Sequence, residues 1–111
     1  MKKTSYKIKI ATQDDEGKMV FCDKVVKGYK LKSKLLSLYA RYNRREREWE
    51  VTEGTSGHLC AFFVKKEDCT EENVVKFLKE RRITPDRFAQ MIADKITYYG
   101  YVNQEIQKGD L

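Results

Sequence analysis

Residues 24–47 read KVVKGYKLKSKLLSLYARYNRRER, and the interpretation of this stretch decides the predicted fold. It holds nine Lys or Arg residues against a single acid, Glu46. Fourteen basic and five acidic residues lie up to Arg47, whereas nine basic and twelve acidic residues follow it. The positive charge is therefore concentrated in the first part of the chain. Such a concentration favours a polyanion or an acidic protein surface as the partner.

After Gly28 the apolar residues recur at helical spacing, which predicts an α-helix over residues 31–45. Its buried face would consist of Leu31, Leu35, Leu38, Tyr39 and Tyr42. Beside that face, one stripe of the helix would present cations to solvent. The stripe and its flanks comprise Lys27, Lys30, Lys34, Arg41, Arg44 and Arg45.

Two β-hairpins are predicted around this helix. Alternation over residues 5–12 and the apolar run over residues 19–26 flank the acidic turn at 13–17. Trp49 and Val51 alternate with polar residues, and the turn at 54–57 separates them from the apolar run at 59–64. Because that last run is apolar on both alternating faces, we expect it in the middle of the sheet.

Asp68 or Thr70, and Thr84 followed by Pro85, are helix-start signals that predict helices over residues 70–82 and 85–99. The predicted order is ββαββαα. We therefore expect one α+β domain over residues 1–111, with a four-stranded, largely antiparallel sheet and helices packed on one face. Residues 103–111 are expected to form a mobile tail.

The sequence contains no set of residues that predicts catalysis or a cofactor, so we do not expect an enzyme. His58 is the only histidine and has no nucleophile at a motif spacing. Cys22, Cys60 and Cys69 do not reproduce a zinc spacing, so no metal site is expected. We expect three free thiols, with Cys22 and Cys60 buried in strands and Cys69 the most reactive because it lies near a helix start.

No apolar run approaches the roughly 20 residues that span a bilayer, and no signal peptide follows Met1. A cytoplasmic location without a membrane partner is therefore expected. We hypothesise a small basic nucleic-acid-binding accessory protein, of the kind that phages or other mobile elements encode. In this hypothesis the basic helix contacts the DNA or RNA backbone.

Two other interpretations remain open. In the first interpretation, the protein is a non-enzymatic inhibitor or adaptor that docks on an acidic protein surface. It could, for example, block a nucleic-acid groove of a nuclease. In that case the expected contacts are either Tyr98 and Tyr101, which lie on either side of Gly100, or the outer edge of the predicted strand over residues 5–12. In the second, the basic stripe has no partner and is only a solvated face.

Overall fold

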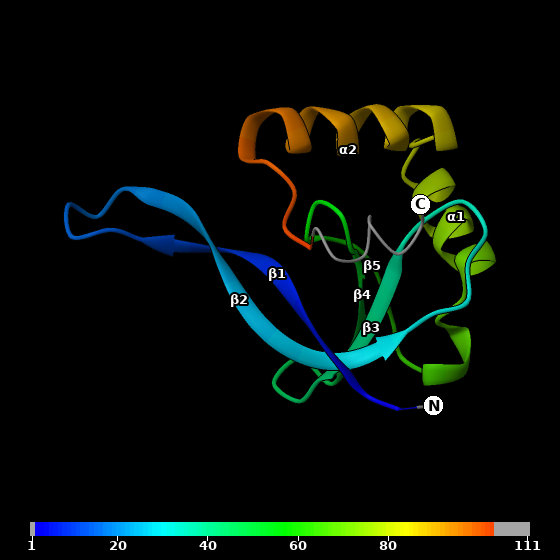
Figure 1. Cartoon of the computed structure of the whole chain (residues 1–111). Coiled ribbons are helices and arrows are strands. Elements are labelled where there is room, and N and C mark those ends of the chain that lie inside the picture. The colour runs from blue at the N-terminus through cyan, green and yellow to red at the C-terminus, as the bar shows by residue number, and fades with distance from the viewer. Residues whose placement is uncertain (1, 104–111) are drawn as a thin grey trace.

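The computed structural model describes residues 2–103, and in this part of the chain five β-strands precede the helices. All five strands pair antiparallel in chain order, β1-β2-β3-β4-β5 (Figure 1). The α+β class and the antiparallel sheet are confirmed, but the sheet has five strands instead of four. The elements are β1 (Thr4–Gln13), β2 (Met19–Lys30), β3 (Leu38–Asn43), β4 (Glu48–Glu53), β5 (His58–Phe63), the 3-10 helix η1 (Lys66–Asp68), α1 (Glu71–Glu80) and α2 (Pro85–Tyr99).

The predicted helix over residues 31–45 is wrong, because a loop and strand β3 occupy this stretch. Three successive residues of β3, Leu38, Tyr39 and Ala40, are buried. A helix on a surface buries one stripe at intervals of three or four residues, whereas a strand covered on both faces buries neighbours. Pairing with β2 on one side and β4 on the other overrides the local helix preference.

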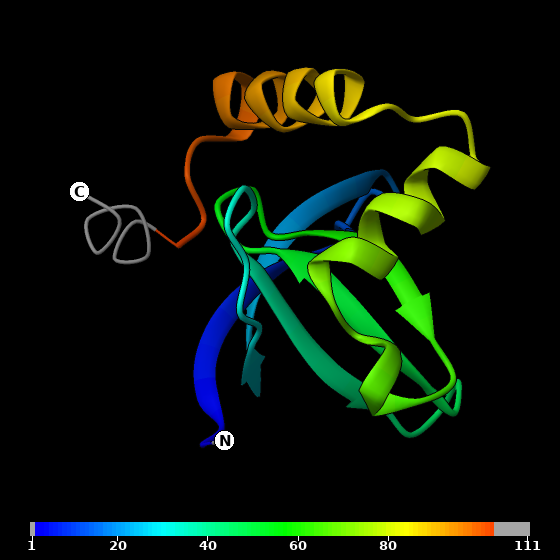
Figure 2. The ribbon, with the colours of Figure 1, turned by 90° about the vertical axis from the view of Figure 1, so that its right-hand side faces the viewer.

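The two faces of β3 contact different parts of the protein. Leu38 and Ala40 belong to the main core, to which α1 contributes Val74 and Leu78. Tyr39 points to the opposite face, where its ring stacks on that of Tyr6 with centroids 4.4 Å apart. The base of the β1–β2 hairpin therefore covers one face of β3 while α1 lies against the other (Figure 2).

A glycine allows the hairpin to cross β3 closely. A Cβ atom on Gly28 would lie 2.4 Å from the backbone oxygen of Ala40 and 2.9 Å from the hydroxyl of Tyr6. Both distances are shorter than any van der Waals contact, so a side chain at this position would push the two strands apart. The close crossing therefore depends on the absence of a side chain at position 28.

The rest of the β1–β2 hairpin forms an arm that projects from the body of the protein (Figure 1). The two strands pair without interruption from Thr4 opposite Gly28 to Gln13 opposite Met19. In contrast, β2 pairs with β3 only at Tyr29 and Lys30. Most of β2 is therefore held by one neighbouring strand.

The position predicted for the apolar run at 59–64 is also wrong. β5 lies at the end of the strand order, and Leu59 and Phe62 are exposed by 52% and 42%. The apolar character of this strand instead reflects a contact with α1, because the rings of Phe62 and Phe63 both meet that of Phe77.

The two predicted C-terminal helices are confirmed in type and approximate extent. The hydroxyl of Thr70 accepts the backbone N–H of Asn73, and the hydroxyl of Thr84 accepts that of Arg87. These bonds satisfy N–H groups that the first turn of a helix leaves without partners. From its start beside α1, α2 crosses the top of the molecule toward the arm (Figure 1).

The chain returns to the sheet after α2. Asn103 is buried, and its side-chain amide donates to the backbone oxygens of Lys7 at 2.9 Å and Gly54 at 2.6 Å. Its Oδ1 atom accepts the N–H of Lys7 at 2.8 Å. The predicted mobile tail began at residue 103, but Asn103 is anchored; residues 104–111 lie outside the described part of the chain.

Leu38 and Leu35, which the helical pattern placed on one buried face, differ completely in exposure, at 0% and 82%. We therefore expect Leu38→Ala to lower the free energy of unfolding by about 2 to 5 kcal/mol, because it leaves a cavity in the core. Leu35→Ala should change it by less than about 0.5 kcal/mol. Urea unfolding followed by circular dichroism measures both values, and equal losses would contradict the assigned strand.

Candidate nucleic-acid interface

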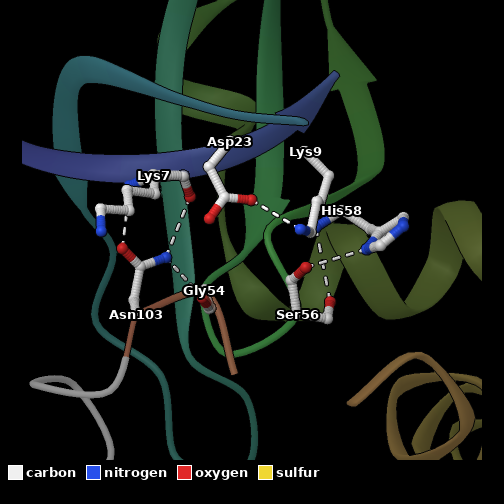
Figure 3. Close-up of polar contacts among 7 residues, drawn as sticks. All are labelled: Lys7, Lys9, Asp23, Gly54, Ser56, His58 and Asn103. Atoms are coloured by element: carbon white, nitrogen blue, oxygen red, sulfur yellow. Dashed lines mark hydrogen bonds and ion pairs between the residues drawn. The ribbon is translucent and has the colours of Figure 1, made fainter. Parts of the chain in front are cut away.

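Polar side chains gather where the β1–β2 hairpin meets the turn between β4 and β5 (Figure 3). The backbone N–H of Lys9 donates to the Gly57 oxygen at 2.8 Å, and the Lys9 ammonium pairs with the Asp23 carboxylate at 2.6 Å. Beside them, the Nδ1–H of His58 donates to the Ser56 oxygen at 2.9 Å. The first of these bonds attaches the hairpin to the turn, the ion pair joins β1 to β2, and the His58 bond lies at the end of the turn itself.

One polar atom at this junction, Nε2 of His58, is buried without a hydrogen-bond partner among the described residues. The rings of Phe21 and Tyr99 lie on the imidazole, each with its centroid 6.1 Å away. Burial is the main reason that the pKa of His58 is lowered, and the charges of Lys95 and Lys9 lower it further. The imidazole is therefore held in its neutral form.

This junction does not have the geometry of a nucleophilic site. The hydroxyl of Ser56 accepts the backbone N–H of His58 instead of donating to the imidazole ring. A catalytic serine needs its hydroxyl hydrogen-bonded to the base that removes its proton. The arrangement is thus that of a structural contact.

The structure separates the residues of the predicted basic stripe. Lys30 and Lys34 are exposed near one end of β3, and Arg44 and Arg45 are exposed in the turn beyond its other end. A strand of six residues spans about 20 Å, so the two pairs lie far apart. Together they do not form one continuous surface.

Arg41 is not a free cation, because its guanidinium pairs with the carboxylate of Glu50 at 2.9 Å. Both side chains are largely buried, which makes this pair part of the sheet. Lys27 is exposed on β2, two residues before Tyr29. Alternate residues of a strand point to the same face, so Lys27 and Tyr29 share one side of β2.

Three aromatic side chains form a row on the face of the sheet that α1 covers further along. Tyr29 lies opposite Ala40, and Tyr42, on the same face of β3, lies opposite Trp49. The ring of Trp49 is 6.3 Å from that of Tyr29 and 5.5 Å from that of Tyr42, between centroids. Tyr29 and Trp49 are half-buried, while Tyr42 is 44% exposed.

Two lysines border this row of rings. The ammonium of Lys66, in η1, lies 4.0 Å from the ring centroid of Tyr29 and 5.7 Å from that of Trp49. Lys3, before β1, approaches Tyr29 to 5.9 Å. We call this surface the aromatic-basic face, and it consists of Lys3, Tyr29, Tyr42, Trp49 and Lys66.

The predicted site and the observed face overlap only in part. Arg44 and Arg45 belong to the turn that joins Tyr42 to Trp49 along the chain, so they lie at the edge of the aromatic-basic face. Trp49, Lys66 and Lys3 were missed. The pattern of basic residues interleaved with tyrosines at Tyr29 and Tyr42 was the available signal, but the helical interpretation assigned Tyr42 to the core.

Tyr98 and Tyr101, the contacts predicted for a protein partner, lie elsewhere. They are exposed by 81% and 41%, and the Tyr98 ring meets that of Tyr99 edge-on at 4.6 Å. Tyr99 in turn contacts Phe21 of β2. The two exposed tyrosines therefore lie near the contact between α2 and the arm and are not part of the aromatic-basic face.

The described residues contain three free cysteines and no cluster of side chains suited to a metal ion. The predicted burial of Cys22 and the predicted reactivity of Cys69 do not agree with the structure. Cys22 is exposed, whereas Cys69 is buried, and burial raises its pKa to about 11. Cys22, not Cys69, is thus the accessible thiol.

Within residues 2–103, no helix is long and apolar enough to cross a membrane.

No protein-family model, curated protein or solved structure matches this chain.

The lowered pKa of His58 predicts the direction of the pH dependence of stability. The unfolded chain has the ordinary histidine pKa of about 6.5, so below that pH it binds a proton more readily than the folded protein does. We expect the free energy of unfolding to decrease between about pH 7.5 and 5.5, above the range where most carboxylates titrate.

The measurement is urea unfolding of the wild type and of His58→Asn across this range. Asn keeps a donor for the Ser56 oxygen but does not titrate, so its stability should change less over the same interval. An equal pH dependence of the two proteins would show that His58 is not the group responsible.

Proposed function

We propose that the protein is a non-enzymatic binding protein for single-stranded nucleic acid and that the aromatic-basic face is its binding surface. The supporting observation is the contact of the Lys66 ammonium with both the Tyr29 and Trp49 rings, in a row that Tyr42 continues. Proteins that bind single strands combine aromatic rings, on which bases stack, with cations that contact phosphates. Both components are present here within one small surface.

The rings favour a single strand over a duplex. Bases in a duplex already stack on each other, so a protein ring gains a face to stack on only when a base is unpaired. The arginines of the turn after β3, together with Lys3 and Lys66, supply charge around the rings. The ligand class is therefore an unpaired DNA or RNA segment of a few nucleotides.

An acidic protein surface is the alternative partner for a basic face, as in an inhibitor or adaptor. Charge alone does not distinguish the two partners, because carboxylates and phosphates both attract lysine. The aromatic row favours nucleic acid, since rings spaced 5.5 and 6.3 Å apart offer surfaces on which unpaired bases can stack. For this reason we favour nucleic acid.

Trp49 is the only tryptophan of the chain, so its fluorescence reports directly on the proposed site. We expect an oligothymidine strand to quench it, with Tyr42→Ala weakening binding by about 1 to 3 kcal/mol because one stacking ring is lost. Tyr98→Ala is the matched control, since it removes an exposed tyrosine that is not part of the aromatic-basic face. No quenching at low salt, or equal losses in the two variants, would contradict the proposal.

Phosphate contacts make the affinity depend on salt. Four contacts, from Lys3, Lys66, Arg44 and Arg45, correspond to a slope of about −3 for log affinity against log salt on a single strand. Lys66→Ala should reduce the magnitude of the slope by about 0.7, whereas Lys79→Ala on α1 should leave it unchanged. Fluorescence titrations over a series of salt concentrations measure the slopes. If the wild-type slope is near zero, phosphates do not take part.

A further inference from the structure

One edge of β2 presents backbone groups that are not paired within the described protein. On β1, the polar backbone groups of Lys7 and the N–H of Lys9 point away from β2, because they bond to Asn103 and Gly57. In an antiparallel pair, opposite residues share this orientation. The partners of Lys7 and Lys9 are Val25 and Asp23, so their N–H and C=O groups point away from β1.

The same alternation extends this free row along the arm to Phe21. β3 begins to occupy this edge only at Tyr29, where it pairs through Ala40. No hydrogen bond of the described structure satisfies the backbone groups of Phe21, Asp23 or Val25 on the free side. A strand edge of this kind is a template for another strand.

The side chains along this edge include several exposed apolar groups beside the charged Asp23 and Lys24. Met19, Phe21 and Val25 are exposed by 59%, 47% and 62%, and Cys22 is exposed between them. Proteins usually blunt free edges with charges, prolines or a covering loop. In Figure 1 the arm extends beyond the end of α2, so a strand can approach it from outside.

We propose that this edge pairs with the same edge of a second copy of the chain, antiparallel and centred on Cys22. A symmetric pairing must place each residue opposite the one equally far from the centre. A centre at Asp23 or Lys24 brings each charge against its own copy. A centre at Val25 extends the partner strand to Tyr29, where β3 already pairs.

The remaining choices of central residue differ in how many residues pair and in which charges face each other. With Phe21 at the centre, Lys18 faces the partner's Lys24, and centres nearer the tip leave few strand residues to pair because β2 begins at Met19. With Cys22 at the centre, residues 19–25 of both copies pair and no like charges are opposed. Met19 then meets the partner's Val25, and Phe21 meets the partner's Asp23.

The backbone pattern agrees with this register. Phe21 and Asp23 have free groups that point outward, so they form the hydrogen-bonded pairs, and Cys22 forms a non-hydrogen-bonded pair with the partner's Cys22. Side chains are closest in such pairs, which brings the two Cys22 side chains together. The two hairpins thereby become one four-stranded sheet across the dimer, which covers the exposed edge.

Cysteine crosslinking tests the register in a Cys22→Ser background. The register places Val20 opposite the partner's Lys24, so an equimolar mixture of V20C and K24C proteins, one carrying a mass tag, should form a mixed disulfide on addition of diamide. Either protein alone should crosslink at least tenfold more slowly. Crosslinking of V20C alone at the rate of the mixture, or no crosslinking of the mixture, would overturn the register.

Sedimentation equilibrium tests the association itself with unmodified cysteines. We expect the wild type to pass from monomer to dimer with increasing concentration, V20K to dimerise at least tenfold more weakly and V20E at least as well as wild type. Both variants place a long polar side chain opposite the partner's Lys24, but only Lys repels it. If the wild type remains monomeric at millimolar concentration, the proposed dimer is wrong. The free edge of β2 would then be available only to a strand of another protein.

Discussion

The buried carboxylate of Glu53 organises the turn on which three separate parts of the chain converge. It accepts the backbone N–H groups of Thr55 and Ser56 and so fixes the turn between β4 and β5. The carbonyl groups of that turn are then free to bind Lys9 of β1, Val102 and Asn103. A buried charge is tolerated only when it is well hydrogen-bonded, and here its bonds also position the acceptors for both ends of the described chain.

Strand β3 determines where the groups of the proposed binding surface lie. As a helix, residues 31–45 would have carried their cations on a single stripe; as a loop and strand, they send Lys34 and Arg44 to opposite ends. The strand also brings Tyr42 beside Trp49, which a helix could not do. The basic residues that are close together in the sequence are spread apart in the structure, where a row of aromatic rings is bordered by a few cations. The proposed nucleic-acid binding therefore depends on stacking and charge together, and not on charge alone.

Local signals predicted the elements whose stability is mainly local. Thr70 and Thr84 cap their own helices, and the strands on either side of the turns at 13–17 and 54–57 pair with each other. β3 was not predicted in this way, because Leu38, Ala40 and Arg41 are favourable in helices and Leu38 follows Leu31 and Leu35 at helical spacing. The same limit applies to the site: Lys66 reaches Tyr29 only after β3, β4 and β5 have placed η1 beside β2.

The two proposed surfaces occupy different ends of one strand and do not compete. Tyr29 lies seven residues from Cys22, which corresponds to at most about 23 Å along β2. In a dimer centred on Cys22, the two Tyr29 rings would be separated by at most about 45 Å along the strand direction. One short oligonucleotide would then bind to a single face, whereas a long single strand could reach both. The second contact becomes intramolecular in that case, so the dimer should favour long strands without any change in the aromatic-basic face itself.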